Sequence, residues 1–361
     1  MMEMMDYGWS AGLENLFAPF AGRGLVPGRV IRQQRGLWTA AAAGGELETG
    51  VSGRFRRKAA GAADYPAVGD WAVLRQVEGG RALIEALLAR RSAFIRKAAG
   101  EAVEAQVVAA NVDTVFLVSG LDGDFNIRRI ERYVTTAWSS GAAPVLVLNK
   151  ADLRPEDLAE AAAAAAAVAP GVPVATVSAR AAGGLDPLAP YLEPGKTVAL
   201  LGSSGVGKST IINRLLGEER FATGEVSDAR EGRGRHTTTC RELVRFPGGA
   251  LLVDTPGLRE LGLWADDDGL DRTFDEIERL AARCRFPDCG HGGEPGCAVR
   301  AAVEDGALDP ARRESYLKLR RELRFLELKK DEKTRRQREK AAGRDFAVRL
   351  KEIKRNKQRY R

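Results

Sequence analysis

Short apolar runs alternate with polar residues and turn signals over the first part of the chain, from about Val26 to Ala93. The segments RVIRQQRGLWTAAA, GELETGVSGRF, DWAVLRQV and RALIEALL predict strands, and Gly pairs and a Pro punctuate them. Closely spaced short strands of this kind are typical of a small β-barrel. The length of the region fits five strands, and residues 1–22 precede it as a short extension.

The pattern changes from Asp113 onward, where uninterrupted apolar runs alternate with helix-like segments. TVFLVS, APVLVLN, PVATVS, TVALLG, LVRFP and ALLVDTPG predict buried strands. IRRIERYVTTAWSS and the alanine-rich EDLAEAAAAAAAVA predict helices between them. This alternation predicts a doubly wound α/β domain with a mostly parallel sheet. After about Ala265 the pattern becomes helical.

A phosphate-binding loop follows the TVALLG strand. The segment GSSGVGKST has the form G-x-x-x-x-G-K-S/T and precedes the helix-like IINRLL, which is the context that the motif requires. Its glycines allow backbone N–H groups to converge on phosphates, and the helix N-terminus adds a favourable dipole. We expect Lys208 to neutralise the β- and γ-phosphates and Ser209 to bind Mg²⁺. The predicted nucleotide-binding residues here are Gly202, Ser203, Ser204, Gly205, Val206, Gly207, Lys208, Ser209 and Thr210.

Two further elements of a nucleotide switch follow this loop. Asp254 of DTPG ends an apolar strand, and its carboxylate would hold Mg²⁺ through water, while the Gly257 N–H would contact the γ-phosphate. Between loop and strand lies GRGRHTTTC, from which a threonine should reach Mg²⁺. Thr237, Thr238 and Thr239 are all candidates, and we favour Thr238.

Two segments that could read a guanine base lie before the phosphate loop. Asn149-Lys150-Ala151-Asp152 has the N-K-x-D form, and the Asp152 carboxylate can accept from guanine N1–H and its N2 amino group. Adenine lacks that pair of donors, so it would leave the carboxylate without partners. Asn149 would bind near N7, and the Lys150 stem would cover the ring. One strand later, Ser178 and Ala179 form a second segment whose Ala179 N–H could bind O6.

The order of these elements is unusual. An ordinary guanine-nucleotide domain runs from phosphate loop through switches to base-reading segments, whereas this chain places the base-reading segments first. We interpret the domain as circularly permuted, a change that compact domains with neighbouring termini tolerate.

Four metal-ligand side chains lie close together near the C-terminus. Cys284, Cys289, His291 and Cys297 offer three thiolates and one imidazole within fourteen residues, with glycines that allow tight turns. A closed Cys₃His set is typical of structural zinc. The alternative interpretation is free buried cysteines. Cys240, outside the cluster, is expected to be a core thiol.

Charge is distributed unevenly along the chain. The net charge is +7, yet residues 312–361 carry 21 Lys/Arg and 8 Asp/Glu, so the rest of the chain is net acidic. A basic tail of this density favours a nucleic-acid partner, although a solvated charged helix is the simpler interpretation. The longest uncharged stretch, Ala161–Ala179, is broken by Pro and Gly and predicts no membrane span. With no secretory leader pattern, we expect a cytoplasmic protein.

The permuted order together with GSSGVGKST, GRHTTT, DTPG, ANVD at 110–113 and the Cys/His cluster resembles the ribosome small-subunit-dependent GTPase A family (RsgA/YjeQ). The resemblance covers roughly residues 26–330. It implies a multidomain fold: an extension (1–22), an oligonucleotide-binding (OB)-like RNA-binding barrel (23–105), a permuted GTPase domain (106–265), an α-helical zinc-binding domain (266–330) and a basic tail (331–361). It also implies GTP/GDP, Mg²⁺ and one structural Zn²⁺ as cofactors.

The same resemblance implies a GTPase that binds the 30S subunit and its 16S rRNA and acts in late 30S maturation. We expect the protein to be a monomer. Its hydrolysis of GTP to GDP and phosphate would be stimulated by the subunit. Two alternatives stay open: a GTP-dependent RNA-binding checkpoint, and a GTPase linked to tRNA that 30S does not activate.

The position after Gly257 bears on the mechanism. Many GTPases place a water-orienting glutamine there, whereas this chain has Leu258, which cannot position water. We therefore expect slow intrinsic hydrolysis. His236 is the internal candidate for orienting the water, alongside the roles of Lys208 and Thr238 in the reaction. Contact with RNA is the alternative for His236.

Overall fold

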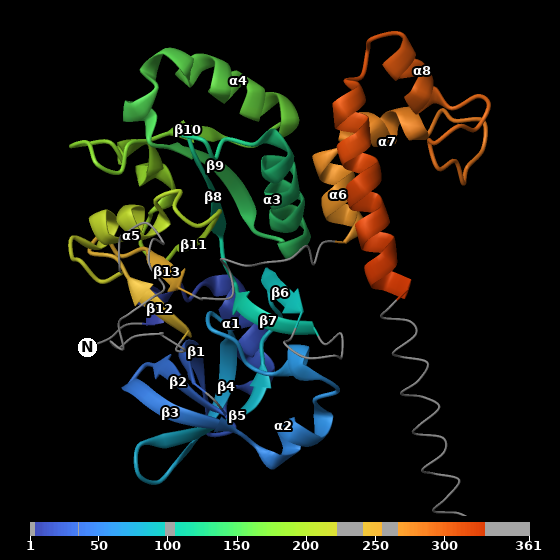
Figure 1. Cartoon of the computed structure of the whole chain (residues 1–361). Coiled ribbons are helices and arrows are strands. Elements are labelled where there is room, and N and C mark those ends of the chain that lie inside the picture. Colours follow the sequence, from blue (N-terminus) through green and yellow to red (C-terminus); the bar gives the residue numbers. More distant parts are fainter. Residues whose placement is uncertain (1–3, 35, 98–104, 222–240, 255–265, 329–361) are drawn as a thin grey trace, which may run out of the picture.

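A computed structural model describes residues 4–34, 36–97, 105–221, 241–254 and 266–328 of the chain (Figure 1). Five strands form the N-terminal barrel: β1 (Leu25–Gln34), β2 (Leu37–Ala42), β3 (Gly45–Val51), β4 (Trp71–Val77) and β5 (Arg81–Leu87). They pair in the order β1-β2-β3-β5-β4, and β4 pairs back with β1 to close the barrel. Only the β3–β5 pairing is parallel. The predicted five-stranded OB-like barrel is confirmed.

One predicted strand is partly a helix. In GELETGVSGRF the strand ends at Val51, and α2 (Gly53–Lys58) begins after Ser52, whose hydroxyl accepts from the Phe55 N–H at 3.1 Å. This is an N-cap, which satisfies a free amide at the start of a helix. Phe55 is buried in the barrel core, so the helix closes one part of the barrel.

The N-terminal extension packs against the barrel. It contains η1 (Met4–Tyr7), α1 (Ala11–Phe17) and η2 (Ala18–Phe20). Leu13 and Phe17 of α1 are buried in one cluster with Trp71, Val73 and Leu88 of the barrel region. The extension therefore covers apolar barrel surface that would otherwise face water.

A second sheet region forms the α/β domain. Its strands are β8 (Thr114–Gly120), β9 (Ala143–Asn149), β10 (Val174–Thr176), β11 (Thr197–Leu201), β12 (Arg241–Arg245) and β13 (Leu251–Asp254), in the order β10-β9-β8-β11-β13-β12. All neighbouring strands are parallel except β12, which runs antiparallel to β13. The predicted mostly parallel sheet is confirmed, and β12 extends it to the barrel through β1.

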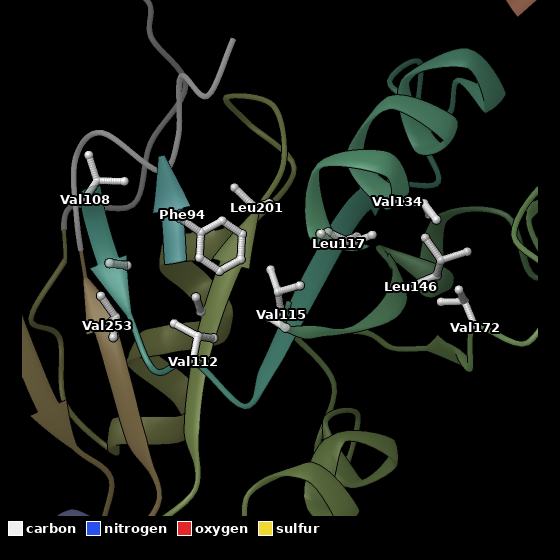
Figure 2. Packing of buried hydrophobic residues seen from close by; sticks show 14 of the residues in the cluster. Phe94, Val108, Val112, Val115, Leu117, Val134, Leu146, Val172, Leu201 and Val253 are labelled. Atoms are coloured by element: carbon white, nitrogen blue, oxygen red, sulfur yellow. The ribbon is translucent and has the colours of Figure 1, made fainter. Parts of the chain in front are cut away.

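Helices cover both faces of this sheet (Figure 1). Val115 and Leu117 of β8 pack on one face with residues of α3 (Ile127–Ser140) and α4 (Leu158–Val168). Figure 2 shows Leu117, Val134 and Leu146 in this packing. Phe116 and Val118 point to the other face, where they pack with α5 (Lys208–Leu216) and η6 (Asp186–Tyr191). The short η4 (Ala151–Leu153), η5 (Pro155–Asp157) and η3 (Ala62–Asp64) lie in connections.

A two-stranded hairpin, β6 (Ala93–Lys97) and β7 (Ala105–Ala110), links the barrel to the sheet. The buried guanidinium of Arg29, on β1, joins the same parts. It donates to the Thr197 hydroxyl at 2.8 Å and to the Asn111 and Gly69 carbonyls at 3.3 Å, and also to the Tyr7 carbonyl. One barrel side chain thus holds the extension, the barrel and the first residue of β11 together.

The C-terminal part is helical, with α6 (Asp267–Thr273), α7 (Asp275–Ala281), α8 (Ala298–Glu304) and a last described helix over residues 310–328. Phe274, Ile277, Val299 and Tyr316 are buried in its small core. It lies beside α3 in Figure 1. A Cβ at Gly269 would lie 2.0 Å from the Ser139 hydroxyl oxygen of α3, so this contact requires glycine. None of the helices in the described ranges combines the length and the apolar character that a membrane span requires.

Candidate active site and metal centre

The phosphate loop connects β11 to α5 at the carboxyl edge of the sheet. Gly202 has a φ of 156°, and a Cβ there would lie 2.4 Å from the Val118 carbonyl oxygen. Only glycine therefore lets the loop begin this close to β8. The Lys208 ammonium, at the start of α5, donates to the Gly202 carbonyl at 2.7 Å and to the Ser203 carbonyl. Lys208 is 7% exposed, so its charge is held inside the loop.

Asn149 joins the phosphate loop to the second predicted base-reading segment. Its side-chain amide donates to the Val206 carbonyl at 2.8 Å, and its amide oxygen accepts from the Ala179 N–H at 3.1 Å. Gly207 allows this contact, because a Cβ there would lie 2.3 Å from the Asn149 side-chain nitrogen. Segments that lie 57 and 30 residues from Asn149 thus meet on one buried side chain.

The Ala179 contact bears on the predicted recognition of guanine O6. The N–H that we expected to bind O6 donates to Asn149 in this structure. Binding to O6 would therefore require this N–H to be shared between two acceptors, or Asn149 to shift. Its position beside Asn149 keeps it within the predicted base site.

Asp152 is oriented by the same second segment. Its carboxylate accepts from the Ser178 hydroxyl at 2.5 Å, and this hydrogen bond is the main cause of a lowered pKa of Asp152. The carboxylate is exposed and ionised at neutral pH, so it can accept two donors from a base edge.

Lys150 has a left-handed backbone conformation, with a φ of 65°, and its ammonium pairs with Asp122, two residues after β8. Burial acts to raise the pKa of Asp122, but hydrogen bonds from Lys150 and from the Asp124 N–H outweigh it and lower the pKa. Asp122 was not predicted from the sequence. Its position shortly after a buried strand, as for Asp152, was the available signal.

Three loops therefore meet at one edge of the sheet. They carry Asn149, Lys150 and Asp152 after β9, Ser178 and Ala179 after β10, and residues 202–210 after β11. Asp254 ends β13, the neighbour of β11, at the same edge. Thr238, His236, Gly257 and Leu258 lie outside the described residues, as do Thr237, Thr239 and Cys240.

Two residues of α3 that the sequence did not single out also contact the phosphate loop. The Arg129 guanidinium donates to the Ser203 hydroxyl at 2.5 Å and pairs with Asp124. The Tyr133 hydroxyl lies 3.4 Å from the same Ser203 oxygen. Their spacing of four residues places both on one face of α3.

The four predicted metal ligands converge. The donor atoms of Cys284, Cys289, His291 and Cys297 all lie within 4.8 Å of one another. His291 Nδ1 is 3.6 Å from the sulfurs of Cys284 and Cys297, and these two sulfurs are 4.0 Å apart. A tetrahedral ion with about 2.3 Å bonds to sulfur requires ligand separations of about 3.8 Å, so the donor set fits a tetrahedral metal ion.

The surroundings of the cluster also suit a cation. Burial, together with the neighbouring thiols, raises the pKa of Cys289 to about 11, and burial lowers the pKa of His291. Burial makes the thiolate form of Cys289 unfavourable. A cation at the centre of the cluster would make that form favourable again. Glu294 accepts from the N–H groups of Gly290, Gly292 and Gly293, which fixes the loop between the ligands.

Comparison with known proteins places these features in a family. The model of the RsgA GTPase family matches residues 87–264. A protein of Opitutus terrae named "Small ribosomal subunit biogenesis GTPase RsgA" is 52% identical over 331 residues, which cover 89% of this chain and 90% of that protein. A protein of the same name from Syntrophotalea carbinolica is 47% identical over 330 residues, with 89% and 90% covered.

Two solved structures share the fold. YjeQ from Thermotoga maritima is 29% identical with a TM-score of 0.62, covering 83% of this chain and 98% of that chain. YloQ, described as a circularly permuted GTPase, is 23% identical with a TM-score of 0.59, covering 83% and 95%. The permuted order predicted from the sequence is confirmed. The chain belongs to the RsgA GTPase family and is a GTP hydrolase.

Proposed function

We propose that the chain hydrolyses GTP to GDP and phosphate in response to the small ribosomal subunit, during late maturation of that subunit. The main support is that relatives named for small-subunit biogenesis are 42–52% identical to this chain over most of its length. The assembly of three loops into one nucleotide site, through Asn149, supports retention of the activity.

In this proposal the base site reads guanine. The Asp152 carboxylate accepts from N1–H and the N2 amino group, with Ser178 holding its orientation. The Lys150 stem lies over the ring, with its ammonium held by Asp122. Asn149 holds the phosphate loop and the Ala179 segment together and reaches the base edge near N7.

The phosphate site uses the loop of residues 202–210. Lys208 would leave the loop carbonyls for the β- and γ-phosphates, as a phosphate supplies stronger charge-assisted hydrogen bonds. Ser209, Asp254 and Thr238 are the proposed Mg²⁺ ligands, directly or through water. Gly257 is the proposed γ-phosphate sensor, and His236 is a candidate for orienting the attacking water.

The Cys₃His cluster is proposed to hold one structural Zn²⁺. Three thiolates and an imidazole fill all four positions of a tetrahedral ion, so no open position is left for chemistry. The ion would fix the loop that joins α7 to α8.

The barrel and the tail are the proposed contacts to 16S rRNA. On α2, Arg54, Arg56, Arg57 and Lys58 are exposed, and none of them forms an ion pair with another described residue. With the basic tail, they would contact phosphates largely without regard to sequence. The protein is proposed to be a cytoplasmic monomer. Its proposed units are residues 1–22, 23–105, 106–265, 266–330 and 331–361.

The test is GTP turnover with and without purified 30S subunits, at one fixed salt concentration. Strong stimulation by 30S is the expected result. Turnover that 30S leaves unchanged would favour the RNA-binding checkpoint instead. Stimulation by tRNA alone would favour a tRNA-linked GTPase.

A further inference from the structure

Arg129 is a cation beside the phosphate loop with no role in the site as described so far. It lies in the first turn of α3, where the capping Asn126 side chain accepts from its N–H at 3.1 Å. Its guanidinium donates to the Ser203 hydroxyl at 2.5 Å. The carbonyl of the same Ser203 accepts from the Lys208 ammonium. Two cations, from α3 and α5, therefore contact one residue of the loop.

The geometry of Arg129 leaves much of its hydrogen-bonding capacity available. Only one terminal nitrogen, Nη1, takes part in the contacts to Ser203 and Asp124. Nε and Nη2 form no hydrogen bond to another described residue, and the side chain is 36% exposed. A guanidinium has five donors in a planar fork that suits phosphate oxygens. Arg129 is thus anchored at one end while its other donors remain open.

The fold places this side chain beside the phosphate loop. β8 and β11 are neighbouring parallel strands, so the start of α3, after β8, and the phosphate loop, after β11, lie at the same edge. The N-terminus of the fourteen-residue α3 also adds a positive dipole end. The ion pair with Asp124 and the hydrogen bond to Ser203 both involve Nη1 of Arg129.

The chemistry calls for such a group. Water attacks the γ-phosphorus, the bond to the bridging oxygen breaks, and GDP leaves with that electron pair while the proton of the water passes to phosphate or solvent. Negative charge spreads over the transferring phosphoryl group in the transition state, and an arginine supplied in cis or in trans can stabilise it. Leu258 cannot supply a polar group at the position after Gly257.

We propose that Arg129 is a catalytic residue that contacts the terminal phosphate of GTP through Nε or Nη2 while Nη1 stays anchored. This assignment rests on the proposed nucleotide site. Tyr133, which shares the Ser203 hydroxyl, acts as a positioning residue for that anchor.

The test compares Arg129→Gln, Arg129→Lys and the matched control Arg128→Gln with the wild type. Arg128 precedes Arg129 on α3 but pairs with Glu131, away from the phosphate loop. The readouts are GDP affinity, 30S-stimulated kcat, and the gain in affinity for GDP when aluminium fluoride is added. Aluminium fluoride mimics the transferring phosphoryl group.

For Arg129→Gln we expect GDP affinity within about twofold of wild type and a kcat lower by about 10³-fold, the lower end of the effects known for arginines that act in this way. The increase in GDP affinity on addition of aluminium fluoride should disappear in this variant. Arg128→Gln should keep both this increase and the kcat of the wild type. Arg129→Lys, which keeps the charge but loses the fork, should recover only part of kcat.

A kcat for Arg129→Gln within about threefold of wild type would overturn the assignment. An equal loss of GDP affinity and of aluminium fluoride binding would also overturn it, because Arg129 would then only support the loop. If the wild type itself binds no GDP, the proposed nucleotide site fails instead, so the two failures are distinguishable.

Discussion

A buried ionic network fastens the C-terminal helical part to α3, and its removal gives the most quantitative prediction. Glu131 of α3 and Arg312 of the 310–328 helix are 0% and 7% exposed, and their closest atoms are 2.9 Å apart. Arg312 also pairs with Glu276 and donates to the Thr273 carbonyl at 2.6 Å and the Val168 carbonyl at 3.0 Å. One guanidinium therefore holds α3, α7 and the end of α4 together.

Arg312→Met keeps the apolar stem and removes the charge. Breaking a buried ion pair from one side costs about 3–5 kcal/mol, because the remaining charge stays desolvated. Here Glu131 keeps a hydrogen bond from Arg128 and one from Ser315, which reduces the loss. The two carbonyls that lose a donor cost about 1–3 kcal/mol each if they stay dry. With the two carbonyls added to the reduced loss of the ion pair, we expect a total loss of at least about 3 kcal/mol.

The assay is denaturant unfolding followed by a probe in the C-terminal part, since a multidomain chain does not unfold in one step. The double variant Glu131→Met, Arg312→Met removes both charges. Its loss of unfolding free energy should be smaller than the sum of the losses of the two single variants, by about 2 kcal/mol or more. A loss below about 1 kcal/mol for Arg312→Met, or strictly additive losses, would refute the reasoning.

Three further predictions concern other parts of the chain. Chelation of the metal, or Cys289→Ser, should release about one zinc per chain and lower the melting temperature of the C-terminal part while GDP affinity changes little, as measured by metal analysis and calorimetry. Gly207→Ala should lower GDP affinity by 10-fold or more in a titration, because its Cβ would displace Asn149; unchanged affinity would contradict the role of that contact. Deletion of residues 351–361 should weaken 30S binding at physiological salt and leave nucleotide affinity unchanged; equal 30S affinity would count against a tail contact.

Periodicity predicted the α/β domain well where packing is local. The segments IRRIERYVTTAWSS and APVLVLN coincide with α3 and β9. The helix buries one face and the strand is buried almost throughout, so each leaves a clear pattern of apolar residues in the sequence. The missed helix α2 had a usable signal in Ser52, an N-cap residue three positions before a buried phenylalanine. Because α2 is only six residues long, its first residues, GRF, were predicted as the end of a strand.

Contacts between distant segments could not be predicted in this way. Glu131 and Arg312 are 181 residues apart, and nothing in either local sequence indicates that they pair. The same holds for Arg29 with Thr197, and for Arg129 with Ser203. Motifs identified the nucleotide loops because their spacing reflects direct chemistry with a ligand, whereas these fastening contacts depend only on how the finished fold brings side chains together.

The central claim is that loops in permuted order form one guanine-specific site, and base specificity tests it most directly. Asp152→Asn replaces an acceptor by an amide that can donate to the O2 of xanthine, which guanine lacks. Fluorescence titration should show that the wild type binds GDP well and xanthosine diphosphate weakly, and that Asp152→Asn reverses this order by 10-fold or more in each direction. Retention of GDP preference by Asp152→Asn, with unchanged affinity, would contradict the account.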